Sequence, residues 1–330
     1  MTHALTHVLT HASDSLRFGP GFDVAVRTAA AASAESRLEN QDNFLLIDTA
    51  GMACFLDGQV ERQQRVQGWP PGHIRLAVLD GMGGHGRGRE AAEAVVAGLL
   101  GMPACATPGE LSSQLDALHA TLQRVFGIDC ARGKRPGTTL TLLELRPGQP
   151  ALLYHVGDSR LYEVTANGAA PLTIDHVPAT AYAMDGLLTE DEWWQQVHGE
   201  HRSQISQAFI LGNAFANPAA LSDPLYALTP LNLPAFLVHL PDRRALELDP
   251  GATYVMATDG FWACPDAPVW LRGWPALLDG KASAADMAAR LFDEIRHRPP
   301  PELYPDNVTA IVFKRRAPDE TALPVAGVAR

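Results

Sequence analysis

IRLAVLDGMGGHGRGREAAEAVVAGLL, residues 74–100, is the stretch that decides the fold. Its apolar run is typical of a buried strand and ends abruptly at Asp80. Four glycines follow between residues 81 and 86, and a helical pattern begins near Arg89. A buried charge is costly unless something pairs with it, and glycines let a backbone approach a ligand closely. We therefore interpret Asp80 as a metal ligand.

The flanking sequence predicts a mixed fold. Apolar runs and alternating patterns predict strands over 21–27, 44–48, 74–80, 138–145, 151–156, 160–165, 253–259 and 307–314. Helical spacing predicts helices over 89–101, 110–126 and 283–297, with shorter helices from Thr189 and over 203–211. A strand is also expected over 236–240. Many strands follow one another too closely for βαβ crossovers, which favours an α+β fold with mainly antiparallel sheets.

Composition narrows the class of protein. With 330 residues, 46% of them hydrophobic, the chain is long enough to bury a sizeable core. A net charge of −11 argues against nucleic acid or an anionic membrane as a partner. The scattered cysteines form no CxxC pair, which predicts reduced thiols, a cytoplasmic location and no structural zinc site. No apolar run approaches a membrane span in length, and the first residues do not resemble a signal peptide.

Five aspartates lie at the ends of predicted strands. They are Asp42, Asp80, Asp158, Asp259 and Asp306. One such aspartate is ordinarily a turn or cap residue, but five suggest oxygen ligands gathered at one end of a sheet. Mn²⁺ or Mg²⁺ suits carboxylate ligands, whereas Zn²⁺ favours histidine and cysteine.

A nucleotide-binding motif competes with this interpretation. Gly81, Gly83 and Gly86 spell GxGxxG between a strand and a helix. That fingerprint requires a second strand ending in an acid about 20 residues further on, and here a helix fills the interval. Asp80 would also direct negative charge at the pyrophosphate. We therefore favour a metal site.

Five motifs together resemble a known family. DGMGGH (80–85), GTTL (137–140), GDSR (157–160), ATDG (257–260) and DNVT (306–309) follow the order seen in the type-2C metal-dependent serine/threonine protein phosphatases, the PPM family. RLENQD (37–42) is similar to that family's opening motif, and DGMGGH resembles its bacterial branch. The resemblance runs from about residue 21 to residue 315.

The resemblance implies a central antiparallel β-sandwich flanked by pairs of antiparallel helices, with two Mn²⁺ or Mg²⁺ ions at one end and a third, weaker ion. Asp80 would bridge the first two ions, with the Gly81 carbonyl as a further ligand. Asp259 and Asp306 would complete the ligands of the second ion. Asp158 would serve the third. The ions would activate a water, so no protein nucleophile is needed.

The opening motif would supply the group that recognises substrate. Arg37 matches the residue that binds the substrate phosphate, and a guanidinium fits a phosphate dianion through two N–H groups. The family usually carries glutamate before Asp42, but this chain has Gln41, so Asp42 would carry more of the metal binding.

Three further positions lie close to these motifs. Met82 stands where some members have a histidine that protonates the leaving group, and methionine cannot do so. Water or a metal-bound species would then protonate the leaving alkoxide, or His85 could supply that proton from three residues on, although a packing or turn role for His85 is favoured. Gln41, His85 and Asn307 are candidates for supporting positions behind the ligands, and Asn307 is expected to satisfy backbone groups near Asp306.

The expected function is hydrolysis of phosphoserine and phosphothreonine on proteins, with substrates made by a bacterial serine/threonine kinase. The alternative is a phosphatase-like binding or regulatory module with little or no turnover, which Gln41 favours. A hydrolase of small phosphate esters is a third interpretation. We expect a monomer with one catalytic domain over 21–315, a flexible lead-in over 1–20 and a disordered tail over 316–330. Long segments at 51–73 and 213–250 are expected insertions.

Overall fold

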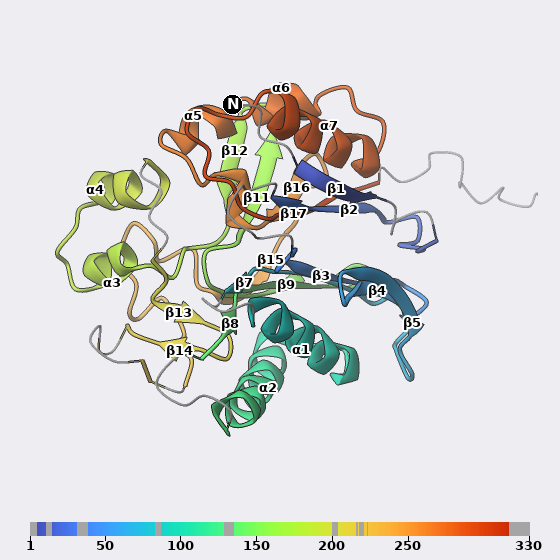
Figure 1. The fold of residues 1–330 in the computed structure, drawn as a ribbon, viewed down its shortest axis with the longest axis horizontal. Helices are drawn as coiled ribbons and strands as arrows, with labels where there is room; N and C mark the ends of the chain where they lie inside the picture. Colours follow the sequence, from blue (N-terminus) through green and yellow to red (C-terminus); the bar gives the residue numbers. More distant parts are fainter. Residues whose placement is uncertain are drawn as a thin grey trace, which may run out of the picture.

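The computed structural model describes residues 5–10, 15–31, 39–82, 87–128, 135–199, 204–215, 217, 221–222 and 224–316. Two antiparallel sheets pack face to face, and helices cover both outer faces (Figure 1). The structure confirms the predicted α+β class with a central antiparallel sandwich flanked by helices.

The sandwich consists of a six-stranded and a seven-stranded sheet. The first runs in the order β1 (Leu5–Thr10), β2 (Phe22–Ala31), β17 (Val308–Arg315), β16 (Thr253–Ala257), β11 (Arg160–Thr165) and β12 (Gly168–Pro171). The second runs β15 (Arg243–Leu246), β10 (Ala151–Val156), β9 (Leu140–Leu145), β6 (Ile74–Leu79), β3 (Asn43–Ile47), β4 (Met52–Asp57) and β5 (Val60–Arg65). Two short pairs stand apart, β7 (Gly81–Met82) with β8 (Gly137–Thr138) and β13 (Gln207–Ala208) with β14 (Gly212–Asn213).

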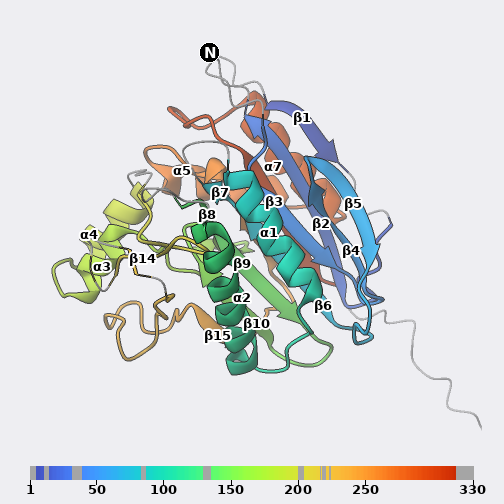
Figure 2. The same ribbon diagram turned by 60° about the horizontal axis from the view of Figure 1, so that its bottom comes forward.

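Helices form the outer layers. The second sheet is covered by α1 (Gly88–Gly101) and α2 (Pro108–Ile128), and the first by α5 (Ala267–Leu271), α6 (Trp274–Leu278) and α7 (Ala284–His297) (Figure 1). Beside the sandwich lie α3 (Pro178–Met184) and α4 (Glu190–Trp194), which continues into a π-helical turn, Gln195–Gly199 (Figure 2). As predicted, Thr189 begins α4, and its side chain and that of Glu192 form a reciprocal cap.

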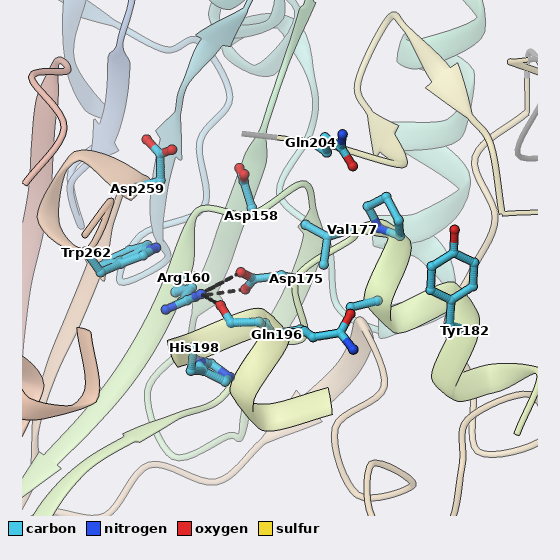
Figure 3. A pocket seen from close by; sticks show the side chains of 13 residues that line it. Asp158, Arg160, Asp175, Val177, Tyr182, Gln196, His198, Gln204, Asp259 and Trp262 are labelled. Carbon is cyan, nitrogen blue, oxygen red and sulfur yellow. Dashed lines mark hydrogen bonds and ion pairs between the residues drawn. The ribbon is translucent and has the colours of Figure 1, made fainter. Parts of the chain in front are cut away.

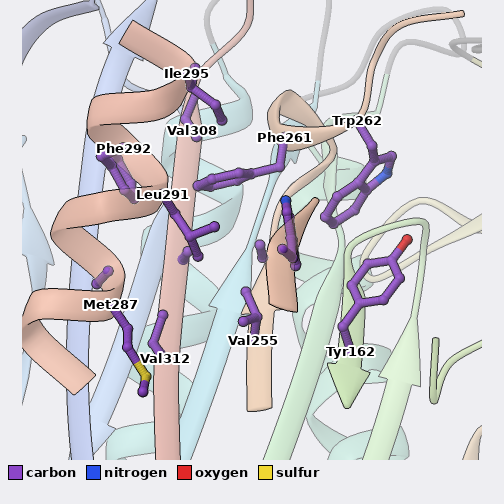
Figure 4. Close-up of a cluster of buried hydrophobic side chains, with 14 of the residues drawn as sticks. Tyr162, Val255, Phe261, Trp262, Met287, Leu291, Phe292, Ile295, Val308 and Val312 are labelled. Atoms are coloured by element: carbon purple, nitrogen blue, oxygen red, sulfur yellow. The ribbon is translucent and has the colours of Figure 1, made fainter. Parts of the chain in front are cut away.

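Three apolar layers hold the sheets and helices together. In β3, Phe44 and Leu46 point between the sheets, while Leu45 and Ile47 point toward α1 and α2. A strand buried on both faces is apolar at most positions, which explains the largely apolar sequences of β3, β6 and β9. On the other side, Leu291 of α7 and Phe261 pack over the first sheet (Figure 4).

Several local predictions differ from the structure. Over 204–211 the predicted helix is absent, because Phe209 exchanges backbone hydrogen bonds with Thr138 and β13 forms instead. The predicted strand over 236–240 is a run of turns whose Leu237 is buried beneath α3 and α4. In α2 a spacing of three and four residues from Leu111 and Leu115 leads to Val125, but Val125 is 56% exposed and Phe126 is buried in its place.

The structure also bears on the lead-in, the first insertion and the tail that the sequence predicts. Residues 5–10, expected in a flexible lead-in, form β1 and pair antiparallel with β2. Residues 51–73, an expected insertion, contain the β4–β5 hairpin. The tail expected over 316–330 lies, beyond its first residue, outside the described residues.

One buried ion pair ties α1 to the second sheet. Arg75 on β6 lies opposite Glu144 on β9, and its Nε and Nη2 donate to Glu144 Oε1 at 2.9 and 2.6 Å. His73 Nε2 also hydrogen-bonds to Glu144. The remaining guanidinium N–H groups donate to carbonyls at the end of α1, namely those of Leu99, Met102 and Pro103. Arg75 thereby caps a helix whose last turn carries no basic residue of its own.

Replacing Arg75 tests this role. Arg75→Met leaves the buried Glu144 carboxylate without its arginine partner and leaves the carbonyls at the end of α1 unpaired. We therefore expect the free energy of unfolding to fall by about 3–5 kcal/mol. Urea denaturation followed by circular dichroism measures the loss. Arg65→Met, which removes an exposed arginine on β5, serves as the control and should cost less than about 1 kcal/mol. Equal losses in the two variants would contradict the assignment.

Candidate metal centre

The register of the second sheet brings two of the predicted ligands to one end of the sandwich. Asp80 follows the last residue of β6, and Asp42 precedes the first residue of β3. These strands pair antiparallel with Asn43 opposite Leu79. The two aspartates therefore leave neighbouring strands at the same end of the sheet.

The first sheet delivers the other three aspartates to the same end. Asp259 follows β16 after one residue, Asp306 lies just before β17, and Asp158 lies just before β11. Ala257 is opposite both Ala310 of β17 and Arg160 of β11, so these three strand ends coincide. Asp158 also lies in the turn where the chain passes from the second sheet into the first. All five strand-end aspartates thus converge from two sheets at one end of the sandwich, which we call the acidic end.

Burial and mutual repulsion dominate the electrostatics of this end. Burial raises the pKa of Asp80 well above 3.8, and Asp259, Asp42, Asp306 and Asp158 raise it further. Burial and the neighbouring Asp306 raise the pKa of Asp259 to about 6. Burial is also the main cause of the raised pKa values of Asp42 and Asp158. Asp42, Asp80, Asp158 and Asp259 thus each lie within electrostatic range of other carboxylates, and the net effect of their surroundings is to raise their pKa values.

The donor atoms fit a hard divalent cation. Asp259 Oδ1 is buried and has no hydrogen-bond partner among the described residues. An unpaired carboxylate oxygen beside other carboxylates is a costly arrangement that a cation would relieve. Within the described ranges, however, no three histidine, cysteine, aspartate or glutamate side chains already have the geometry that holds a metal ion. The structure therefore groups the carboxylates, and their assignment as ligands stays a prediction.

The backbone around Gly81 is too crowded for a side chain. A Cβ on Gly81 would lie 2.4 Å from the backbone oxygens of Gln41 and Gly88. On the other side, Asp80 N donates to Thr139 Oγ1 at 2.8 Å, and Asp80 O accepts from Thr139 N at 2.9 Å. The glycine therefore allows three segments to meet, and the GTTL motif supplies the threonine that fixes the Asp80 backbone.

Hydrogen bonds between the sheets hold the opening motif in place. Gln41 N donates to Asn307 Oδ1 at 2.9 Å, which confirms that Asn307 satisfies a backbone group at this site. Asp42 N donates to Asn40 Oδ1, and Asp42 Oδ2 accepts from Thr258 Oγ1 at 2.9 Å. Segments that lie more than 200 residues apart in the sequence are thus fixed to one another. Arg37 and His85 lie outside the described residues, so their proposed roles stay predictions.

A buried ion pair between Arg160 and Asp175 lies beside Asp158. Arg160 is buried, and its guanidinium binds both oxygens of Asp175. It also stacks over the Trp262 ring, with Cζ 4.8 Å from the ring centroid. These residues line a cavity of about 130 Å³ that continues from Asp158 and Asp259 (Figure 3). GDSR was recognisable as a motif, but nothing in the sequence showed that its arginine pairs with Asp175.

The sandwich, its helix layers and its acidic end define the class, a PPM-type serine/threonine phosphatase fold. No family model matches the sequence. The chain is 33% identical over 120 residues to the serine/threonine protein phosphatase PstP of Mycobacterium tuberculosis, which is 36% of this chain and 23% of PstP. It therefore spans less than a quarter of that curated relative.

Solved structures extend the likeness over most of the chain. A serine/threonine phosphatase of S. agalactiae is 20% identical, with a TM-score of 0.60 over 89% of this chain and 99% of that one. The PstP/Ppp phosphatase of Mycobacterium tuberculosis is 21% identical, with a TM-score of 0.56 over 90% and 100%. The catalytic domain of PstP in complex with two manganese ions is 21% identical, with a TM-score of 0.54 over 90% and 99%. These comparisons confirm the resemblance that the motifs indicate, and at such identities they establish the fold.

The acidic end predicts how stability depends on pH and on metal. A carboxyl whose pKa is raised in the folded protein stabilises the fold below its ordinary pKa of 3.8 and loses that stabilisation as the pH rises through about 6. The metal-free protein should therefore lose stability over this range. Mn²⁺ should offset the loss, contributing about 2.7 kcal/mol at a hundredfold excess over its Kd. The metal-induced rise in Tm should be larger at about pH 7.5 than at about pH 4.5, because carboxylates bind metal when they are deprotonated.

Calorimetry with Mn²⁺ and with EDTA measures both effects. Asp259→Asn removes one of the crowded charges, so it should stabilise the metal-free protein at neutral pH and weaken its response to Mn²⁺. Asp191→Asn, on the exposed surface of α4, should change neither quantity. A Tm of the parent protein that does not respond to Mn²⁺ would contradict the metal centre.

Proposed function

We propose that this protein is a metal-dependent phosphatase that hydrolyses phosphoserine and phosphothreonine in proteins. The observation that carries the proposal is the convergence of five strand-end aspartates at one end of a PPM-type sandwich. The named phosphatases that share this fold, and the manganese ions of the PstP catalytic domain, support it.

The proposal assigns a role to each ligand. Asp80 would bridge two Mn²⁺ or Mg²⁺ ions, with the Gly81 carbonyl on one of them and Asp259 and Asp306 on the other. Asp158 would hold a third ion. Ions held in this way lower the pKa of a water and clamp both oxygens of an in-line displacement.

The opening motif would contribute a metal ligand and bind the substrate phosphate. Asp42 would contribute a carboxylate, with Gln41 beside it, and their backbone is already anchored through Asn307 and Asn40. Arg37 would bind the substrate phosphate through paired N–H groups. The proton for the leaving oxygen would come from water, from a metal-bound species or from His85, since Met82 cannot supply it.

The setting of this activity is also proposed. Substrates would be phosphoproteins made by a bacterial serine/threonine kinase, and the enzyme would act in the cytoplasm as a monomer. Cys54, Cys105 and Cys264 are buried free thiols, which supports a reducing compartment. Among the described residues, no helix has the length and apolar character that a membrane crossing requires.

A phosphatase-like binding module is the alternative, and Gln41 is the residue that favours it. Gln41 is 7% exposed, so a neutral amide occupies a buried place where related proteins usually have a carboxylate. Retention of Asp80, Asp259 and Asp306 favours turnover instead.

A paired assay decides between these functions. Mn²⁺-dependent hydrolysis of p-nitrophenyl phosphate and of a phosphothreonine peptide is expected, and EDTA should abolish it. Asp80→Asn should lower kcat about a hundredfold or more, because loss of a ligand is at least as severe as loss of its supporting contacts. Absence of Mn²⁺-dependent turnover would contradict the proposal that the protein is an enzyme. Hydrolysis of the small ester alone would instead indicate a hydrolase of small phosphate esters.

The Gln41 position offers a second prediction. Gln41→Glu adds a buried negative charge beside the aspartates, so it should raise the affinity for Mn²⁺ about tenfold and destabilise the metal-free protein. Titration of Mn²⁺ by calorimetry gives the affinity directly. Gln59→Glu is a matched substitution, since Gln59 contacts the same segment through Asn40 N but lies on an exposed turn. A Gln41→Glu variant with unchanged affinity would show that this side chain does not face the ions.

A further inference from the structure

The turn that carries Asp158 depends on other residues for its backbone conformation. Gly157, which links β10 to Asp158, has a positive φ of 112°, and a Cβ there would lie 2.6 Å from Thr139 Cγ2. This geometry favours glycine, but glycine is also the residue with the widest choice of backbone conformations. The direction in which Asp158 points therefore depends on the contacts that hold the backbone groups of Gly157.

His176 holds both backbone polar groups of Gly157. Its Nδ1 accepts a hydrogen bond from Gly157 N at 3.2 Å, and its backbone N donates to Gly157 O at 2.8 Å. His176 is fully buried in the segment between β12 and α3. On the other side of Asp158, Ser159 Oγ lies 2.6 Å from Thr139 Oγ1. Both neighbours of Asp158 are thus held by contacts with distant residues.

The hydrogen bonds of His176 show where its ring proton lies. Gln207 Oε1 accepts from Tyr226 N and Gln207 Nε2 donates to Tyr226 O, which fixes the orientation of the Gln207 amide. Its Nε2 also donates to His176 Nδ1 at 2.9 Å. Because Nδ1 accepts from two N–H groups, it carries no proton, and the proton of the neutral ring lies on Nε2. His176 Nε2 faces Asp242 Oδ2 at 3.5 Å.

The surroundings of His176 keep the ring in this neutral form. Burial lowers the pKa of His176 well below 6.5, and His155 and Arg243 lower it further. A protonated ring would carry a hydrogen on Nδ1 and could no longer accept from Gly157 N. The neutral imidazole is therefore the form that holds the turn.

We propose that His176 is a positioning residue that orients Asp158 for the third, weaker ion by fixing the backbone of Gly157. The inference rests on the proposed function, because Asp158 is a ligand only in that proposal. Contacts that orient a metal ligand tune the affinity of the site as the ligand itself does. Gln207 extends this support to the connector after α4, since it joins His176 to the backbone of Tyr226.

Calorimetric titration with Mn²⁺ tests this role. His176→Leu keeps an apolar side chain in the buried place but removes the acceptor for Gly157 N. The weakest Mn²⁺ site should then bind about tenfold to a hundredfold less tightly, while the tighter sites keep their affinity. His176→Asn restores an oxygen acceptor close to the place of Nδ1 and should recover most of the loss.

His119 offers a matched control. It is also a buried histidine whose Nδ1 accepts from a backbone group, Ile210 N at 3.0 Å. His119→Leu therefore removes the same kind of contact at a place other than the Asp158 turn. It should lower the free energy of unfolding but leave the weakest Mn²⁺ site unchanged. Equal weakening of that site in His119→Leu and His176→Leu would reflect a general loss of stability and would overturn the positioning role.

A double variant shows whether His176 acts through Asp158. Asp158→Asn weakens the third site by itself, so adding His176→Leu to it should weaken Mn²⁺ binding no further. Additional weakening in the double variant would show that His176 acts by another route and would overturn the inference.

The parent protein gives a readout that needs no stable variant at position 176. Proton–nitrogen correlation spectra of the imidazole rings, recorded at neutral pH, should show a neutral His176 with its proton on Nε2, and a proton on Nδ1 would overturn the inference. A parent that turns over with only two bound ions, or His176→Leu with an unchanged weakest site, would overturn it as well. A parent with neither Mn²⁺ binding nor turnover would instead contradict the proposed phosphatase function itself.

Discussion

Repulsion among buried carboxylates is the constraint on which the rest of this structure depends. Four other aspartates raise the pKa of Asp80 at one end of the sandwich. Left alone, such a cluster would favour a looser fold, because charged groups out of water repel strongly. Within the second sheet Thr139 fixes the Asp80 backbone, and Thr258 donates to Asp42 across the two sheets, so both sheets hold the cluster together. A divalent cation would turn the same repulsion into binding energy.

Two buried arginines connect the outer elements to this sandwich. Arg75 pairs with Glu144 across neighbouring strands and caps α1, whose opposite end begins beside Gly81 at the acidic end. Arg160 pairs with Asp175 and reaches the π-helical turn through the Val197 carbonyl, which fixes the far wall of the cavity. Each arginine satisfies backbone carbonyls as well as a carboxylate. Buried ion pairs of this kind contribute less to net stability than to defining which segments meet.

The sequence predicted elements well where they make their own core. The β3, β6 and β9 strands and α1 and α7 lie close to their expected ranges, because continuous apolar runs and three- or four-residue spacings reflect burial directly. Prediction failed where a distant partner decided the outcome. Residues 204–211 follow the pairing of Phe209 with Thr138, and Phe126 replaces Val125 in the core because of how α2 faces the second sheet.

The same division applies to the candidate site. The sequence by itself determined that aspartates end several apolar strands, that Gly81 follows Asp80, and that oxygen ligands favour Mn²⁺ or Mg²⁺, because these properties belong to residue types and their local order. Only the tertiary structure decided that two sheets bring the aspartates to one end, since strand register depends on cross-strand packing. It also decided that Arg160 meets Asp175 and that Trp262 faces a cavity, because such contacts join residues whose separation in the chain carries no pattern.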